Sequence, residues 1–443
     1  MGDEQTMHQP TKIKKMKFET KDTSMLKKIK IVCMGMVCVL VASQSAFSGG
    51  EQINLPAQEN LGKPASANST SKSGGLIGFG PDKSWQIHPG FEFKSAYDSN
   101  INREPQRKRN SDVIFDYIPS IELKKSGSRL AVDAGYKMDY QEFITDTSNN
   151  HFNQEAFANI KVTGERLKAS VDEKFAFAKA YASSEQSKRR LYLVNDVRPE
   201  LSYRLTPKVS IAGVYQNYIF DYKDAVIANN SYTLNDFGGR VYYHATPKLD
   251  FYVQGTGTVI DYYRSGLYDA KGFSVLVGSK GKATNKLLVD VQTGYKGHFY
   301  DNSAINSYNT WVFEGMLQYK VTPKLLASLV GKRDKQESVY RAVGWYQAHR
   351  VGLDLNYKYS DHIFFGIDQY YQRNGYASAT TEVGPITKRR VDHILESGAR
   401  IKWLPVQHLI FALGYVFRNR DSNFDNLFDY VDHTVETSIS YKF

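Results

Sequence analysis

Short turns recur along the chain at a nearly constant spacing, and this repeat constrains the fold more than any other feature. Thr206-Pro207-Lys208, Thr246-Pro247-Lys248 and Thr322-Pro323-Lys324 are near-identical, and related turns begin at Thr284 and Ser360. Successive turns are 40, 38, 38 and 38 residues apart. Because proline has a fixed φ and cannot continue a central ladder, these segments are predicted to be hairpin turns.

The same spacing extends the repeat in both directions. It predicts further turns at residues 125–128, 164–166 and 404–406, which makes eight short turns in all. Two amphipathic runs and one longer polar loop separate successive turns. A first strand near residues 86–97 and a closing strand at residues 431–443 bring the total to about eighteen. An even number of strands places both ends of a barrel on the short-turn side.

The expected strands alternate between apolar and polar residues. In the closing strand Val435, Ile439 and Tyr441 share one face, and polar residues occupy the other. A soluble sandwich alternates in the same way. Three features favour a barrel in a membrane over a soluble sandwich. They are strands of roughly 10–14 residues, short turns opposite long loops, and aromatic residues near strand ends. The chain is therefore predicted to be all-β, with a transmembrane antiparallel up-and-down β-barrel over residues 84–443.

The N-terminal segment is predicted to be removed. Residues 31–42 are apolar, follow several lysines and precede Ala46-Phe47-Ser48, which is the order of a secretory signal peptide. Cleavage is expected after Ser48, and translation is expected to start at Met25. Residues 49–83, rich in Gly, Ser, Ala, Asn and Lys, are interpreted as a disordered periplasmic leader or, alternatively, as an arm that docks a periplasmic partner.

The amino-acid composition excludes several other classes of protein. No apolar run of 18 or more residues exists, and the mean hydropathy is −0.47, so a helical membrane protein is excluded. The 31 Tyr and 24 Phe are compatible with aromatic girdles. Both cysteines lie inside the signal peptide, so no disulfide framework is expected. Removing residues 1–48 takes eight Lys and four acidic residues from the net charge of +11, and the remaining +7 is too diffuse to indicate nucleic acid.

Polar residues on the inward face imply a wet lumen, because a barrel of this size leaves an aqueous channel unless loops plug it. The candidate pore-lining residues carry both signs of charge. They are Glu122, Lys124, Asp290, Lys296, Glu314, Lys320, Asp354, Lys358, Glu396, Arg400, Glu436 and Lys442. They are interpreted either as a transport path or as cross-strand ion pairs that satisfy one another on the wall.

Basic clusters recur in the loops expected on the outer side. They are Arg107, Lys108 and Arg109; Lys188, Arg189 and Arg190; and Lys388, Arg389 and Arg390. Such clusters could bind lipopolysaccharide phosphates or an acidic polymer. The alternative is that they only keep the loops soluble.

No catalytic, cofactor-binding or metal-binding motif is found, so a non-enzymatic protein without a cofactor is expected. Asp361-His362, Asp392-His393 and Asp432-His433 are adjacent, but neighbours on a strand point to opposite faces. Barrels that act as surface hydrolases bring Ser, His and acid residues together from different strands near the rim. That alternative stays open, because the sequence alone does not reveal which residues of different strands meet at the rim.

The first two expected strands carry a family resemblance. Residues 91–101 (FEFKSAYDSNI) and 111–121 (SDVIFDYIPSI) resemble the second putative beta-barrel porin family. The resemblance implies a place in the outer membrane of a Gram-negative bacterium. Some members of that family are similar to components of exopolysaccharide secretion, which implies a polar conduit that works with a periplasmic polysaccharide export protein. The closing strand resembles the segment that the barrel assembly machinery recognises.

Three functions remain as hypotheses at this stage. The first is a conduit for polysaccharide export, and the second is a diffusion porin for small anionic solutes. The third is a hydrolase at the rim of the barrel, acting on lipid or surface polymer. A loop folded into the lumen would favour the porin, and a rim cluster of Ser, His and acid residues would favour the hydrolase.

Overall fold

The computed structural model describes residues 77–79, 84–340, 343–379, 388–424 and 427–442. The expected signal peptide, most of the expected leader and the final Phe443 lie outside the described residues. No helix within the described part is long and apolar enough to cross a membrane.

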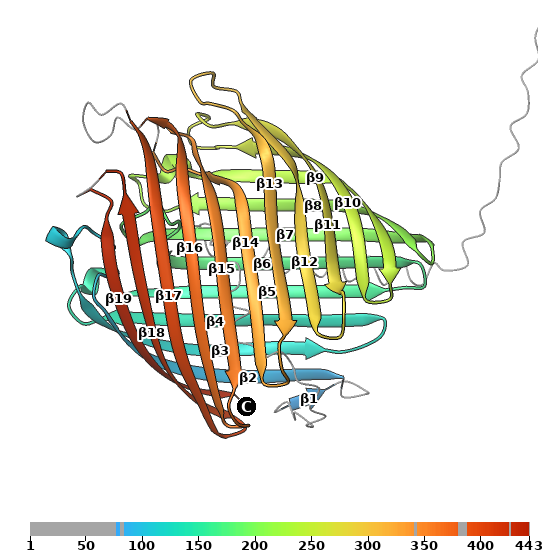
Figure 1. Ribbon diagram of the computed structural model, residues 1–443, viewed down its shortest axis with the longest axis horizontal. Helices are drawn as coiled ribbons and strands as arrows, with labels where there is room; N and C mark the ends of the chain where they lie inside the picture. Colours follow the sequence, from blue (N-terminus) through green and yellow to red (C-terminus); the bar gives the residue numbers. More distant parts are fainter. Residues whose placement is uncertain (1–76, 80–83, 341–342, 380–387, 425–426, 443) are drawn as a thin grey trace, which may run out of the picture. The chain divides into compact units, whose positions relative to one another are not determined.

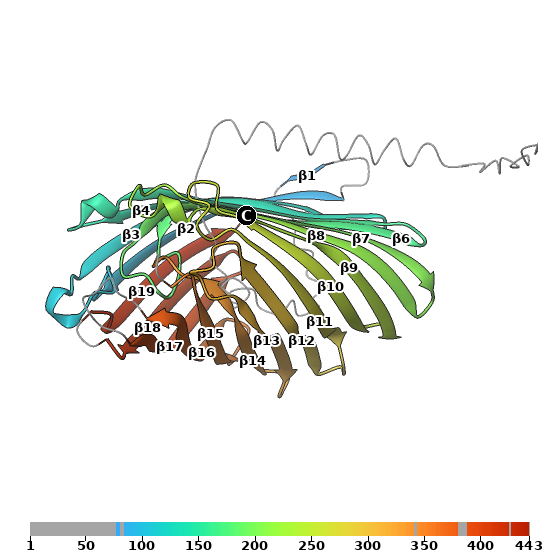
Figure 2. The same ribbon diagram turned by 90° about the horizontal axis from the view of Figure 1, so that it is seen from above.

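The long strands of the described residues form one closed antiparallel sheet (Figures 1 and 2). They are β2 (Trp85–Asp98), β3 (Asp112–Lys125), β4 (Leu130–Phe143), β5 (His151–Thr163), β6 (Leu167–Ala180), β7 (Arg190–Thr206), β8 (Val209–Tyr222), β9 (Tyr232–Thr246), β10 (Leu249–Asp261), β11 (Ala270–Lys282), β12 (Leu287–Tyr300), β13 (Tyr308–Lys320), β14 (Leu325–Glu337), β15 (Trp345–Lys358), β16 (Ile363–Ala379), β17 (Arg389–Val406), β18 (Leu409–Ser422) and β19 (Tyr430–Lys442). Each strand pairs with the next, and β19 closes the ring on β2. The predicted barrel of about eighteen strands is confirmed.

The long loops, so far as the structure describes them, lie at one end of the strands and carry the only regular structure outside the sheet that the described residues contain. Three single 3-10 turns occur there: η1 (Gln106–Lys108), η2 (Thr147–Asn149) and η3 (Ala228–Asn230). The short turns lie at the other end. This asymmetry between the two ends is the one that the sequence predicts.

A repeated hydroxyl stabilises the short turns. After β13, Thr322 Oγ1 accepts hydrogen bonds from the backbone N–H groups of Lys324 (3.2 Å) and Leu325 (2.9 Å). The same two bonds form at Thr206, Thr284 and Ser360. A Thr or Ser side chain that bonds the backbone two or three residues later favours a turn. The recurring hydroxyl therefore has a physical cause that is independent of the proline.

The last short turn differs from its predicted position. It lies at residues 407–408, because β17 continues to Val406. The register between β17 and β18 shifts between Trp403 and Val406. A proline lacks the N–H that a regular ladder requires, so Pro405 is accommodated at this irregularity and does not end the strand.

A short strand, β1 (Ile77–Phe79), lies within the segment that the sequence analysis interprets as a leader. It pairs with β2 from Ile77↔Ile87 to Phe79↔Trp85. The pairing of β19 with β2 ends at Lys442↔Gly90, so β1 occupies the part of this β2 edge that β19 leaves unpaired. Unpaired strand edges attract further backbone, which explains a strand in a segment without apolar periodicity.

Candidate functional site

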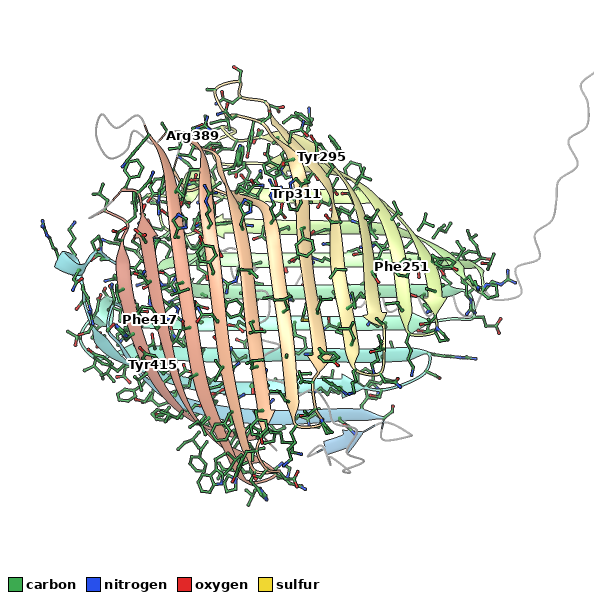
Figure 3. All side chains as sticks on the ribbon, in the orientation of Figure 1. Phe251, Tyr295, Trp311, Arg389, Tyr415 and Phe417 are labelled. Atoms are coloured by element: carbon green, nitrogen blue, oxygen red, sulfur yellow. The ribbon has the colours of Figure 1, made fainter. Side chains whose placement is uncertain are left out.

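The two faces of the barrel wall differ in chemistry. Phe251, Tyr295, Trp311 and Tyr415 lie on the outside (Figure 3) and are between 42% and 53% exposed. Exposed apolar and aromatic side chains on a closed sheet match a lipid solvent. Because side chains alternate along a strand, the intervening residues face the interior.

The twelve candidate pore-lining residues all occupy inward positions. On β12, for example, Asp290 and Lys296 alternate with the outward Val291 and Tyr295. The others follow the same alternation on β3, β13, β15, β17 and β19. That these residues line a path for a solute stays a prediction.

Most of these charges have a partner of opposite sign. Glu122 lies 2.6 Å from Lys124 and 3.6 Å from Lys442. Further pairs are Asp290–Lys280, Lys296–Asp334, Glu314–Lys332, Lys358–Asp361 and Arg400–Asp368. Asp354 accepts a hydrogen bond from Tyr370. Lys320 and Glu436 have no ion pair within 4 Å among the described residues. This arrangement fits the interpretation as mutually satisfied ion pairs on the wall.

Glu396 is the centre of the most extended of these networks. It contacts Arg418 at 3.0 Å and Arg350 at 3.7 Å, and Arg418 also contacts Asp432 at 3.2 Å. These residues come from β15, β17, β18 and β19. A charge network that links four strands, and that reaches across β16 from β15 to β17, fixes the wall near the long-loop end of the barrel.

The loop of residues 181–189, which joins β6 to β7, reaches the far wall. Its Ser184 Oγ accepts hydrogen bonds from Gln372 Nε2 and Asn374 Nδ2, both 3.0 Å long. These two partners belong to β16, which is nine strands from β7 in a ring of eighteen. The loop therefore crosses the lumen, and we call it the crossing loop.

Arg420 of β18 holds the backbone of the crossing loop. Its Nη1 donates to the carbonyl oxygens of Ser184 (2.9 Å) and Glu185 (3.2 Å), and its Nη2 donates to Ser187 Oγ (3.1 Å). The Arg420 side chain is only 1% exposed. A buried guanidinium with several acceptors fixes the loop in one geometry.

Glu185 joins the crossing loop to the loop of residues 338–344. It is fully buried, and its carboxyl oxygens accept hydrogen bonds from Ser338 Oγ (2.6 Å) and Val339 N (2.9 Å). Burial raises the pKa of Glu185 to about 7, although the Arg390 guanidinium and these hydrogen bonds oppose the shift. The carboxyl is therefore protonated far more readily than an exposed glutamate.

An aromatic cluster supports the crossing loop from the β7–β12 side. Ala182 of the loop packs within it, Gln186 Nε2 donates to Tyr222 (2.6 Å), and Val339 packs against its edge. The aromatic members are Tyr192, Tyr218, Phe220, Tyr222, Tyr232, Tyr262, Tyr268 and Tyr300. These side chains pack together on one side of the lumen at the long-loop end.

The first long loop contacts the crossing loop through Arg103. Arg103 has a φ of 48°, a conformation that non-glycine residues seldom adopt. Its guanidinium lies 3.8 Å from the ring centre of Tyr181, and Arg189 lies 5.2 Å from the same ring. Burial raises the pKa of Tyr181 to about 12. Two guanidinium groups therefore lie beside Tyr181, the first residue of the crossing loop.

The basic clusters predicted from the sequence lie in these loops. Lys188 contacts Glu104, three residues before the first cluster, at 3.9 Å, whereas Lys388 donates to the carbonyl of Asn423. Arg390 departs from the expectation of an exposed contact. It is 1% exposed and pairs with Asp392 at 2.7 Å, so its charge is neutralised by a buried ion pair and does not face an external ligand.

The chain is similar to a family of proteins and to several solved structures. A family model described as Putative beta-barrel porin 2 matches residues 83–443. Crystal structures of OccAB4 from Acinetobacter baumannii and of the outer membrane protein OpdK from Pseudomonas aeruginosa are similar at 11% and 9% identity, each with a TM-score of 0.44. They cover 82% and 81% of this chain and 100% and 98% of their own. No curated protein matches the sequence.

Proposed function

Because the chain belongs to the putative beta-barrel porin 2 family, an outer-membrane channel, we propose that it is a diffusion porin for small anionic solutes. The observation that carries this proposal is the crossing loop, which is anchored on both walls and narrows the lumen. A narrowed lumen suits single small molecules. Export of a polysaccharide, the other hypothesis for a channel, requires this loop to be displaced.

The preference for anions follows from the arginines that gather around the crossing loop. Arg103, Arg189 and Arg420 have no acidic partner within 4 Å in the described part of the chain. Fixed charge of one sign at a constriction raises the local concentration of the opposite ion. The paired charges lower in the lumen contribute much less to selectivity, because each is balanced by a neighbour.

The refolded barrel is expected to conduct Cl⁻ in preference to K⁺ across a planar bilayer under a salt gradient. Replacing Arg103→Gln and Arg189→Gln together should lower the permeability ratio roughly twofold or more. The matched control is Arg107→Gln with Lys108→Gln, which removes two exposed charges from the same loop region. A wild-type preference for K⁺, or equal effects of the two double variants, contradicts the proposal.

Adding a long acidic polysaccharide to the bilayer experiment distinguishes a diffusion porin from an export conduit. With the crossing loop in place, we expect the polymer to leave the current unchanged from either side. Large conductance steps that the polymer blocks from one side only would support export instead. In that case a periplasmic export protein becomes the partner to seek.

Contacts with other components remain proposals. We propose that β19 is recognised by the barrel assembly machinery, and that the exposed Arg107, Lys108 and Arg389 contact lipopolysaccharide phosphates or an acidic polymer. The apolar outer face supports a location in the outer membrane of a Gram-negative cell.

A further inference from the structure

Three side chains at the short-turn end form a continuous hydrogen-bonded relay. Ser210 Oγ lies 2.8 Å from His244 Nε2, and His244 Nδ1 lies 2.7 Å from Asp250 Oδ1. They come from the consecutive strands β8, β9 and β10. With Nδ1–H donating to the carboxylate, Nε2 is left to accept the serine proton. This is the order of contacts in a nucleophile, base and orienting acid.

Comparison of equivalent positions in the internal repeat distinguishes these residues from their counterparts. In each of the five repeats whose turn begins with Thr or Ser, the residue two positions before the turn pairs with the residue four positions after the first turn residue, as in Lys320↔Leu326 and Lys358↔Phe364. The first position is basic and the second apolar in those repeats and in Lys282↔Leu288. Among the five hairpins whose turns begin at Thr206, Thr246, Thr284, Thr322 and Ser360, the two that hold the relay depart from this pattern, with Arg204↔Ser210 and His244↔Asp250.

Local backbone irregularities accompany the relay. The register between β7 and β8 shifts between Arg204 and Thr206, and the register between β9 and β10 shifts between Leu249 and Asp250. Bulges redirect side chains and are frequent beside active sites. They lie next to Ser210 and His244, the two residues whose relative orientation the relay requires.

The relay is open to the interior. The side chains of His244 and Asp250 are 25% and 39% exposed, while Ser210 is 7% exposed and held beneath the imidazole. Ser210 and Asp250 face inward, because they alternate with the outward Ile211 and Phe251. Arg204 lies opposite Ser210 in the register, and its guanidinium donates a hydrogen bond to the carbonyl oxygen of Glu165 in the turn before β6.

We propose that Ser210, His244 and Asp250 hydrolyse small carboxylic esters that enter the lumen. Ser210 Oγ attacks the ester carbonyl carbon while His244 Nε2 takes the hydroxyl proton. The tetrahedral intermediate breaks the bond to the alcohol oxygen, which receives that proton from His244, and an acyl-serine remains. Water, deprotonated by His244, then attacks the acyl carbon, and the carboxylic acid leaves as the proton returns to Ser210. Asp250 holds the imidazole tautomer throughout.

The test uses the refolded full barrel with two probes. A serine-directed fluorophosphonate, which forms an Oγ–P bond and loses fluoride, should label Ser210, as located by peptide mass spectrometry. Hydrolysis of p-nitrophenyl acetate should fall about 100-fold in Ser210→Ala and by a similar factor in Asp250→Asn. The control is Ser274→Ala, because Ser274 is also inward and buried but bonds Thr256 at 2.7 Å and has no imidazole partner.

Labelling that is lost in Ser210→Ala and kept in Ser274→Ala supports the relay as a catalytic site. Asp250→Asn keeps the hydroxyl and the imidazole, so a selective loss of labelling rate in that variant distinguishes an activated serine from a merely buried hydrogen bond. An unlabelled Ser210 in a barrel that shows full β circular dichroism overturns the proposal. So does ester hydrolysis that is equal in all three variants.

Discussion

Deleting Ser184, Glu185 and Gln186 is expected to raise the single-channel conductance of the refolded barrel roughly threefold or more, because an eighteen-strand barrel without a plug encloses an aqueous channel. The deletion removes the contacts with β16, with the loop of residues 338–344 and with Tyr222. The six loop residues that remain can still join β6 to β7, since these strands are adjacent and hairpin loops of that length are common.

The matched control removes Thr147, Ser148 and Asn149, which form η2 in the loop between β4 and β5. This loop bonds its own strands and Lys179 of β6, on the same side of the barrel, and makes no hydrogen bond to the far wall among the described residues. Its removal should leave the conductance within about 20% of wild type, because the lumen is unaffected. If both deletions leave the conductance unchanged, the crossing loop is not what limits the current.

The strands and short turns could be predicted because their causes are local. A turn such as Thr322-Pro323-Lys324 carries its own proline and its own hydroxyl acceptor, and alternation assigns faces within each strand. The inward positions of Asp290 and Glu396 follow from that alternation alone. Closure of the sheet follows in turn, because strands of equal length with no protected edge must pair with each other.

The crossing loop could not be predicted, because its contacts are distant in sequence. Ser338 and Glu185 are 153 residues apart, and Arg420 and Ser184 are 236 residues apart. The loop has neither periodicity nor a motif, so its sequence resembles that of any polar loop. Only the three-dimensional position of β16 and β18 decides whether such a loop extends outward or folds inward.

The Ser210 relay was missed for a different reason. Acid and histidine residues that are adjacent in sequence, such as Asp392-His393, point to opposite faces, whereas partners in a sheet come from neighbouring strands. A signal was nevertheless present. Aligning the repeats on their turns shows that His244 and Ser210 replace residues that are basic and apolar in the later repeats. Departure from an internal repeat can therefore locate a site that no short motif marks.

Docking of the crossing loop is expected to weaken as pH rises from about 4.5 to about 7. Burial raises the pKa of Glu185 from 4.5 to about 7, so the docked loop binds a proton that the undocked loop releases within this interval. Docking is therefore strongest below pH 4.5, and it loses roughly 3 kcal/mol by pH 7, with no further loss above that. Single-channel records should show more frequent openings to a higher conductance level over this range.

Glu185→Gln should abolish this pH dependence and keep the loop docked at every pH. The amide retains an oxygen for Val339 N and offers an N–H to Ser338 Oγ, as the protonated acid does, and it cannot ionise. Other groups near Glu185 are Arg390, Asp392 and Tyr340, and burial raises the pKa of Tyr340 to about 12, outside the interval. A residual transition between pH 4.5 and 7 in the Gln variant would assign the titration to another residue. An unchanged opening frequency in the wild type would show that Glu185 does not control docking.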